Sequence, residues 1–462
     1  MVMTATLNQY VPAHGVRAPA GRAPALRIGA TPVLVGIGAG AVAVLGLWWT
    51  NTTTISGLGD YLTHAGRITG LLAGYGAIIL LGLMARVPAL ERGIGTDRLT
   101  RWHAMGGRYT VSMLVAHGLL ITWGYAVTAR TSVVGQGISL LRDYPDVLYA
   151  TIGAALFVAI GVVSARAARK RMSYEAWHLM HLGTYLAIAL SFLHQFSTGA
   201  DFAGHKPAQI AWSTLYGVVT VLLIWYRVLT PIRQAFRHRM RVEGVRMEGP
   251  DVVSVYLTGR HLDELKAEPG QFFRWRFLTS EGWWASNPYS LSAPVSDGRL
   301  RITVKEAGGH SAQLARLQPG TKVMASGPYG AFTGGVRRRR KVLLIGAGVG
   351  ITPLRTLLET LPGRPGDITL IYRARHMSDL VLRTEIEEIA FDRGARVHYL
   401  VGTREQLGGD PLGAEQLEWL VPNLQHHDVY LCGPESLTAA TREALREAGV
   451  SRRRIHHESF EF

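Results

Sequence analysis

Cysteine is almost absent from this sequence: the 462 residues include one, Cys432. A single thiol excludes an internal disulfide, and it excludes iron–sulfur clusters and zinc sites that several cysteines hold. Redox chemistry in this chain must therefore use a metal held by histidine or an organic cofactor. Acidic residues are also few, 33 against 49 Lys and Arg, which leaves a formal net charge of +16.

The excess of positive charge lacks the pattern of a nucleic-acid-binding protein. Lys and Arg do not gather on one amphipathic element with interleaved aromatics, and most of them lie in loops between apolar segments. That distribution is typical of membrane orientation, so we expect a lipid membrane and no nucleic acid as partner. The length, with 48% apolar residues, is too great for one ordinary domain and suggests three units.

Six apolar segments follow a leader that is rich in Ala, Arg, Pro and Gly. We expect the leader, residues 1–31, to be a disordered cytosolic segment and not a cleaved signal, because the apolar run after it is long enough to span a bilayer. The predicted segments are 32–50, 64–84, 103–125, 148–165, 174–194 and 208–228. Together they predict an all-α bundle of six transmembrane helices over residues 32–230.

The loops between these segments predict the orientation. Clusters of Arg and Lys follow the second, fourth and sixth segments, whereas the opposite loops carry few positive charges. Because positive loops stay inside, we expect a protein of the plasma (inner) membrane with both termini cytosolic. Everything after residue 240 would then lie in the cytosol.

Four histidines lie inside two of the segments. The stretch HAMGGRYTVSMLVAH begins at His103 and ends at His117, and the fifth segment contains His181 and His194. Since both segments run from inside to outside, His103 matches His181 at the inner depth and His117 matches His194 at the outer depth. Two imidazoles at each depth, from two helices, are the ligands that bis-histidine haem iron requires.

The fifth segment leaves two points open. Its histidines are thirteen residues apart, which places them about 140° apart on an ideal helix, so we expect tilt or a local distortion there. His178 competes with His181 for the inner position.

Two arginines, Arg67 and Arg108, also lie inside segments. A buried guanidinium needs an anionic partner, which could be a haem propionate or a carboxylate; snorkelling to the membrane surface is the alternative.

After residue 240 the pattern changes. Residues 241–335 form short β-type runs separated by Gly and Pro, which predicts a small antiparallel β-barrel. In residues 336–462, β-type runs alternate with helical stretches, which predicts an α/β domain with a parallel sheet. The run RRRRK at 337–341 is expected to be a solvated interdomain loop.

Two motifs in the α/β part suggest a nucleotide site. GAGVGITP at 346–353 follows a predicted strand and opens a helix, so its glycines would let the backbone approach a pyrophosphate at the helix N-terminus. A purely structural glycine turn is the alternative. The second motif, CGP at 432–434, ends another predicted strand at the edge of the sheet where ligands bind in such folds.

Two motifs in the β part suggest a flavin site. NPYSLSAP at 287–294 offers a Tyr face for a flavin ring and a neighbouring hydroxyl, and KEAGGHS at 305–311 offers glycine-turn amides for a phosphate. Each motif alone could also be an ordinary strand or loop.

With these motifs, the chain resembles the ferric reductase and NADPH oxidase superfamily, in which a six-helix haem-binding membrane domain is fused to a module similar to ferredoxin–NADP reductase. The resemblance covers about residues 32–462. It implies two b-type haems, an inner one on His103 and His181 and an outer one on His117 and His194. It also implies FAD in the β-barrel domain and NADPH or NADH in the α/β domain.

The resemblance further assigns roles to residues of the motifs. The residues expected to bind FAD are Asn287, Pro288, Tyr289, Ser290, Lys305, Gly308, Gly309 and Ser311, although the family often has Arg or His where this chain has Asn287. Those expected to bind the nicotinamide nucleotide are Gly346, Gly348, Gly350, Thr352, Cys432, Gly433 and Pro434. Catalytic roles would fall to Ser290, to Cys432 beside the nicotinamide, and to Phe460, whose ring would cover the flavin.

The expected activity is transmembrane electron transfer. NAD(P)H would pass a hydride to FAD, and single electrons would then pass through both haems to an outer acceptor, either oxygen, giving superoxide, or a ferric chelate. Two alternatives are a membrane module that donates electrons to a dedicated periplasmic redox protein and a transporter with a nucleotide-binding domain. Arg373 and Arg375 follow a predicted strand and could bind a 2′-phosphate or be solvated, so the choice between NADH and NADPH stays open.

Overall fold

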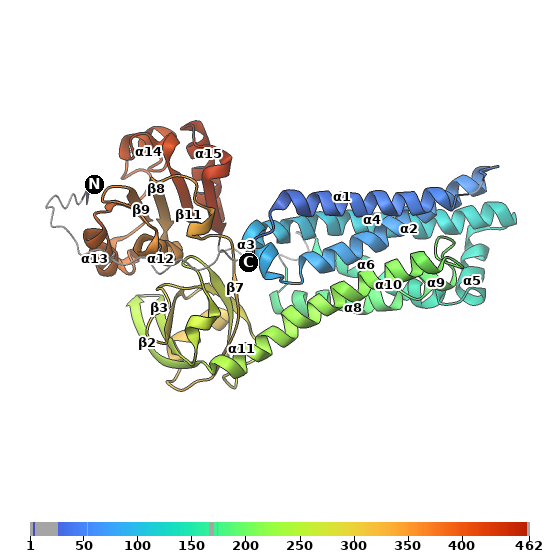
Figure 1. Cartoon of the computed structure of the whole chain (residues 1–462), viewed down its shortest axis with the longest axis horizontal. Helices are drawn as coiled ribbons and strands as arrows, with labels where there is room; N and C mark the ends of the chain where they lie inside the picture. The colour runs from blue at the N-terminus through green and yellow to red at the C-terminus, as the bar shows by residue number, and fades with distance from the viewer. Residues whose placement is uncertain (1–2, 5–25, 53, 166–170, 173, 460–462) are drawn as a thin grey trace. The chain divides into compact units, whose positions relative to one another are not determined.

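The computed structural model describes residues 3–4, 26–52, 54–165, 171–172 and 174–459. They form two compact units (Figure 1). Counting described residues only, the membrane unit lies within Ile28–Val87 and Asp97–Arg227, and the second unit lies within Met1–Arg27, Pro88–Thr96 and Val228–Phe462.

Six helices of the described residues are long and apolar enough to cross a membrane. The helices of this bundle are α1 (Ala30–Thr50), α2 (Leu58–Leu83), α4 (Thr96–Ala129), α6 (Val147–Ser164), α8 (Tyr174–Leu190) and α10 (Lys206–Leu223). The predicted all-α membrane bundle is confirmed. Helices α2 and α4 begin earlier than the apolar pattern predicts, because polar first turns with Asp60 and Asp97 extend them, and acidic residues favour a helix N-terminus.

Short elements join the long helices of the membrane unit and connect it to the second unit. Helix α5 (Val133–Asp143) is N-capped by Ser132, whose Oγ accepts from the backbone N–H of Gly135 at 3.0 Å. Helix α8 ends at Leu190, and a turn separates it from α9 (His194–Ser197). After α10, a π-helical turn (Ile224–Leu229) leads into α11 (Thr230–His238) of the second unit.

The β domain of the second unit consists of two three-stranded antiparallel sheets. One sheet has the order β2 (Arg241–Gly249), β3 (Val252–Thr258) and β6 (Arg299–Lys305), and the other has the order β5 (Asn287–Ser290), β4 (Phe272–Phe277) and β7 (Val323–Tyr329). Isolated bridges join the sheets at Leu291–Ile302 and at Arg241–Lys322. The antiparallel pairing agrees with the predicted β domain, and both sheets contribute to one core. Helix α11 and α3 (Pro88–Ile94) contact β7.

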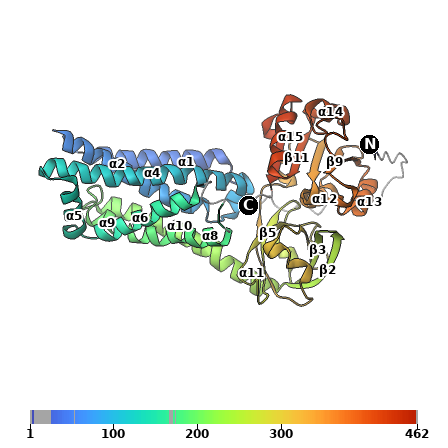
Figure 2. The same cartoon turned by 180° about the vertical axis from the view of Figure 1, so that it is seen from behind.

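The α/β domain has a six-stranded sheet in the order β1-β10-β9-β8-β11-β12. Figure 2 shows two of its strands, β9 and β11, from behind. Its parallel strands are β8 (Val342–Ala347), β9 (Ile368–Ala374), β10 (Arg396–Val401), β11 (Asp428–Gly433) and β12 (Ile455–Ser459). This confirms the predicted parallel sheet. An unexpected strand, β1 (Met3–Thr4), pairs antiparallel with β10; the rest of the predicted disordered leader, residues 5–25, lies outside the described residues.

Helices cover both faces of this sheet. Those on one face are α12 (Ile351–Thr360) and α13 (Arg383–Arg393), and those on the other are α14 (Ala414–Leu420) and α15 (Glu435–Glu447). Strand β8 shows why: Val342 and Leu344 belong to the core with α12, whereas Leu343 and Ile345 belong to the core with α14 and α15. Burial on both faces explains the continuous apolar sequence of this strand.

Candidate cofactor sites

The structure brings the four membrane histidines together in two pairs. The ring centroids of His103 and His181 lie 5.9 Å apart, and those of His117 and His194 lie 6.4 Å apart. The predicted residue, His181, and not its competitor His178, is therefore the one whose ring lies beside that of His103.

A backbone carbonyl faces the Nδ1 atom of three of these rings. The Nδ1 of His117 lies 2.8 Å from the carbonyl oxygen of Gly66, that of His103 lies 3.2 Å from Leu80, and that of His194 lies 2.6 Å from Ser191. Because a carbonyl only accepts, each Nδ1 carries the hydrogen, and each Nε2 keeps its lone pair. Metal-bound histidines are held in this way.

The spacing of each pair suits two ligands on one metal. With metal–nitrogen bonds of roughly 2 Å and ring centres roughly 1 Å behind the nitrogen, two imidazoles on one metal have centroids roughly 6 Å apart. Among the described residues, no group of three or more His, Cys, Asp or Glu could hold a metal ion. Each pair offers two imidazoles, the number of protein ligands that bis-histidine haem iron requires.

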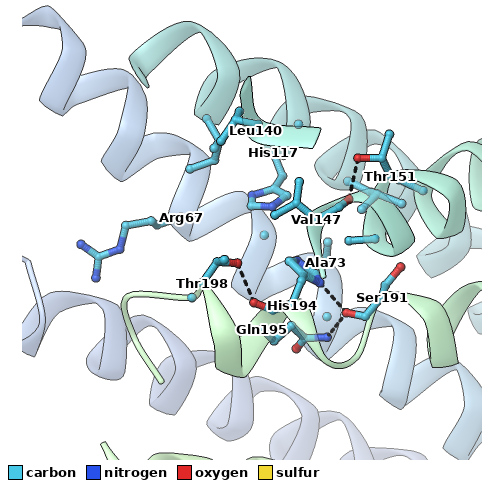
Figure 3. A pocket seen from close by; sticks show the side chains of 18 of the residues that line it. Arg67, Ala73, His117, Leu140, Val147, Thr151, Ser191, His194, Gln195 and Thr198 are labelled. Atoms are coloured by element: carbon cyan, nitrogen blue, oxygen red, sulfur yellow. Dashed lines mark hydrogen bonds between the residues drawn. The ribbon is translucent and has the colours of Figure 1, made fainter. Parts of the chain in front are cut away.

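A cavity of about 820 Å³ is lined by both His117 and His194 (Figure 3). Its walls come from α2, α4, α5, α6, α10, the α8–α9 region and the loop after α9. They are mainly apolar, which is typical of a cofactor site. Gly70 on α2 makes room for the ring of His117, since a Cβ there would lie 2.5 Å from its Nδ1.

Arg67 lines the same cavity and pairs with a carboxylate. Its Nη2 lies 2.5 Å from Oδ1 of Asp201, and its Nε donates to Oδ2 of Asp201 at 3.1 Å. The Nη1 atom lies 3.1 Å from the Nδ1 of His64, which is buried. The sequence did not single out Asp201, because nothing local marks this loop residue as the partner of an arginine 134 positions earlier. Arg108 lies exposed on α4.

The interruption after α8 holds the outer histidine. The carbonyl of Ser191 accepts from the Nδ1 of His194 and, at 3.0 Å, from the Nε2 of Gln195. The Oε1 of Gln195 in turn accepts from the Nε1 of Trp212 at 2.7 Å. The sequence analysis missed Gln195 and Trp212, whose only signal is the proximity of Gln195 to His194.

The flavin motif lies on β5 and just after it. The backbone carbonyl of Tyr289 accepts from the Nε1 of Trp275 at 2.9 Å, and burial raises the pKa of the Tyr289 hydroxyl to about 12. The Oγ of Ser290 is buried and has no hydrogen-bond partner among the described residues. An orphaned buried hydroxyl beside an aromatic ring fits a site whose ligand supplies the missing partner.

The glycine turn after β6 has a backbone conformation that favours glycine. Gly308 and Gly309 have φ values of +84° and +55°, in the left-handed region that favours glycine. The Oγ of Ser311 accepts from the N–H of Ala307 at 2.8 Å and donates to the carbonyl of Gly308 at 2.7 Å. Lys305, at the end of β6, pairs with Asp251 at 3.0 Å. The turn thus presents backbone near the surface, where a phosphate can approach.

The two motifs of the α/β domain lie side by side. Strands β8 and β11 are neighbours, with Cys432 opposite Gly346. Gly348 has a φ of +53°, and a Cβ on Gly350 would lie 2.4 Å from the carbonyl oxygen of Cys432. Thr352 is buried in the first turn of α12, and Gly433 and Pro434 lead into α15. The close backbone approach explains why glycine stands at 350.

The two arginines after β9 differ. The guanidinium of Arg373 donates to the carbonyls of Leu400 at 3.0 Å and Gly402 at 2.6 Å, and burial lowers its pKa, with the charge of Arg375 as a further cause. Arg375 is exposed. Phe460 lies outside the described residues.

Three family models match the chain. The ferric reductase like transmembrane component matches residues 69–192, an FAD-binding domain matches 237–333, and an oxidoreductase NAD-binding domain matches 344–443. These matches and the fold define the class, a membrane oxidoreductase with a flavin- and nicotinamide-binding module.

Similar proteins include the flavohemoprotein of Chromobacterium violaceum, which is 30% identical over 329 residues, covering 64% of this chain and 80% of that protein. The NADPH oxidoreductase of Mycobacterium tuberculosis is 29% identical over 245 residues, covering 51% of this chain and 63% of that protein. Among solved structures, the FAD/NAD-binding domain of the nitric oxide dioxygenase of Vibrio cholerae is 26% identical, with a TM-score of 0.41, covering 48% of this chain and 98% of that one.

The chain belongs to the ferric reductase and NADPH oxidase superfamily. Its membrane domain is fused to an FAD- and NAD-binding reductase module, which supports electron transfer driven by NAD(P)H.

Proposed function

We propose that this protein passes electrons from cytosolic NAD(P)H through FAD and two bis-histidine haems to an acceptor on the outer side of the membrane. The observation that carries the proposal is the pairing of His103 with His181 and of His117 with His194 at two depths of one bundle, with centroid separations of 5.9 and 6.4 Å. The carbonyl contacts at Nδ1 support it, because they leave Nε2 available as a ligand.

The proposed cofactors, FAD and haem, would have different roles in the electron transfer. Flavin exchanges one or two electrons and haem iron exchanges one, so together they join a two-electron donor to a one-electron acceptor. The chain's own residues bind and orient: Ser290 is the donor available to the flavin, and the turn at Gly308 and Gly309 offers amides to its pyrophosphate. The amides around Gly348 and Gly350, at the start of α12, are the proposed site for the nucleotide phosphates.

The acceptor is proposed to be oxygen or a ferric chelate. If His103 with His181 and His117 with His194 each held a haem iron, the haems would supply single electrons and the acceptor would not need to bind the metal. Production of superoxide or Fe(II) by the purified protein alone would support oxygen or a ferric chelate as the acceptor. Electron flow that requires an added periplasmic redox protein would support the alternative, an electron-donating membrane module.

The orientation is part of the proposal. The positively charged loops after α2, after α6 and around α11 are assigned to the cytosol, which places His117, His194 and the large cavity at the outer side.

A reduced-minus-oxidised absorption spectrum of purified protein tests the proposal most directly. Haem bands with two haems per chain, reducible by NAD(P)H, are expected. A spectrum without haem bands would contradict the assignment and favour a transporter with a nucleotide-binding domain.

A further inference from the structure

Glu385 joins three elements of the reductase module. It lies on α13 and accepts from both terminal nitrogens of Arg301, at 2.5 Å and 2.8 Å, and from the Nε of Arg355 at 3.0 Å. Arg301 belongs to β6 of the β domain, and Arg355 belongs to α12 of the α/β domain. One carboxylate therefore binds two guanidinium groups from two domains.

The same cluster reaches the flavin motif. Arg301 donates from Nε to the Oγ of Ser292 at 3.0 Å and from Nη2 to the Ser292 carbonyl at 2.8 Å. Ser292 follows Ser290, the buried hydroxyl assigned to the flavin, by two residues. The hydroxyl and the carbonyl oxygen of Ser292 are thus both held by Arg301, which in turn pairs with Glu385.

The cluster also reaches the nucleotide motif. Arg355 lies three residues after Thr352, on the helix that the glycine turn Gly348–Gly350 opens. The chain of contacts from Ser292 through Arg301 and Glu385 to Arg355 therefore connects the segment proposed to hold the flavin with the helix proposed to hold the nucleotide.

Stability alone does not account for this cluster. The side chains of Arg301 and Arg355 are 8% and 10% exposed. Removing charges from water costs free energy, and apolar replacements of such pairs are often as stable or more stable. What a forked arginine–carboxylate contact supplies is a fixed direction and distance between its partners. A second carboxylate, Glu359, pairs with Arg355, so the four groups carry no net charge.

We propose that Glu385 is a positioning residue for hydride transfer, which fixes the nicotinamide site of the α/β domain relative to the flavin site of the β domain. The inference rests on the transfer of a hydride from NAD(P)H to FAD in the proposed function. In that step the C–H bond of the reduced nicotinamide breaks, its electron pair and hydrogen go to FAD, and solvent supplies the proton that completes the reduced flavin. The rate of such a step falls by up to about a hundredfold for a misplacement of about 1 Å.

Anaerobic stopped-flow reduction of the full-length protein tests the inference. Glu385→Gln keeps the shape of the side chain and removes its charge. We expect the limiting rate of flavin reduction to fall by about ten- to a hundredfold. FAD content should stay the same, and the dissociation constant of NAD(P)H should change by less than about twofold. The charge-transfer absorbance between nicotinamide and flavin should weaken.

Glu387→Gln is the matched control. Glu387 lies on the same helix and pairs with Arg383 at 2.7 Å, but both residues belong to the α/β domain. This variant should reduce its flavin at the wild-type rate. Arg301→Lys, which keeps the charge and loses the fork, should slow flavin reduction as Glu385→Gln does, and it keeps the test decisive if that variant does not fold.

An unchanged rate in Glu385→Gln and Arg301→Lys overturns the inference. So does an equal loss in Glu387→Gln, or a loss that follows FAD content. Haem reduction in the wild-type protein, which occurs after the flavin step, tests the proposed function separately.

Discussion

The Nδ1 atom of His194 lies 2.6 Å from the carbonyl oxygen of Ser191, three residues before it. That carbonyl is available because α8 ends at Leu190 and a turn precedes α9. On one continuous helix, His181 and His194 would point about 140° apart. The turn between α8 and α9 breaks that helix, so this angle no longer applies. One local break therefore both turns His194 toward His117 and supplies the acceptor that fixes its ring.

Replacing His117 should remove one metal site. We expect His117→Ala to contain about half the wild-type haem, because each metal needs two axial ligands. Transmembrane electron flux should be lost, while NAD(P)H still reduces the flavin. Haem content by pyridine haemochrome and anaerobic flavin reduction measure both effects. His205→Ala, an exposed position on the same side, is the control; two haems per chain in His117→Ala would refute the assignment.

A methyl group at position 70 should disturb the outer site alone. The Cβ in Gly70→Ala would lie 2.5 Å from the Nδ1 of His117, too close for that ring to keep its place. We expect a changed spectrum or a lost outer haem with normal flavin reduction. Gly217→Ala on α10 has no atom within 4 Å of its Cβ and should behave as wild type. Identical spectra in both variants would show that the ring position is not needed.

Replacing only Asp201 of the Arg67–Asp201 pair should destabilise the protein more than replacing both residues with apolar ones. The side chains are 11% and 4% exposed, so Asp201→Asn leaves a buried guanidinium without its counter-charge. We expect a loss of about 3–5 kcal/mol, seen as a lower thermal midpoint in detergent. The double variant Arg67→Met/Asp201→Leu should recover most of it, because apolar replacement of both charges is often neutral. A double variant as unstable as Asp201→Asn would contradict this account.

Ser290→Ala should stabilise the flavin-free protein slightly but weaken its binding of FAD. The buried Oγ has no described partner, so its removal should stabilise the flavin-free protein slightly. The same change removes the donor proposed for FAD and should weaken FAD binding by about tenfold, a typical value for one lost hydrogen bond. Thermal midpoints of the apoprotein and FAD titrations measure the two effects. Unchanged FAD affinity would exclude the contact.

The cluster around Glu385 predicts a dependence on pH. Burial alone would raise the pKa of Glu385, but the hydrogen bonds and charges of Arg301 and Arg355 lower it below its ordinary value of 4.5. A carboxyl whose folded pKa is lowered contributes stability that is present above its unfolded pKa and is lost as the pH falls through the folded pKa. The thermal midpoints of wild type and Glu385→Gln should therefore converge below about pH 4.5. If the thermal midpoints of the two proteins still differed by the same amount below that pH, the stabilising role of the charged Glu385 would be contradicted.

Local patterns were sufficient for the sequence to predict the domain classes. Apolar runs of spanning length predicted the helix bundle, and alternation of β-type and helical stretches predicted the parallel sheet, because these periodicities follow from which faces must be buried. The depth matching of the four histidines also followed from the sequence, since length and orientation fix the depth of a residue in a membrane helix.

Contacts between distant segments required the tertiary structure. Asp201 beside Arg67, Gln195 and Trp212 behind His194, and Glu385 between Arg301 and Arg355 depend on how helices and sheets pack, and no local pattern encodes that packing. The sequence determined the candidate ligands and cofactor motifs, because their chemistry is local. Only the fold decided which carbonyl, carboxylate or arginine contacts these residues. Such partners come from distant parts of the chain that are buried together, and their spacing in the sequence does not reveal them.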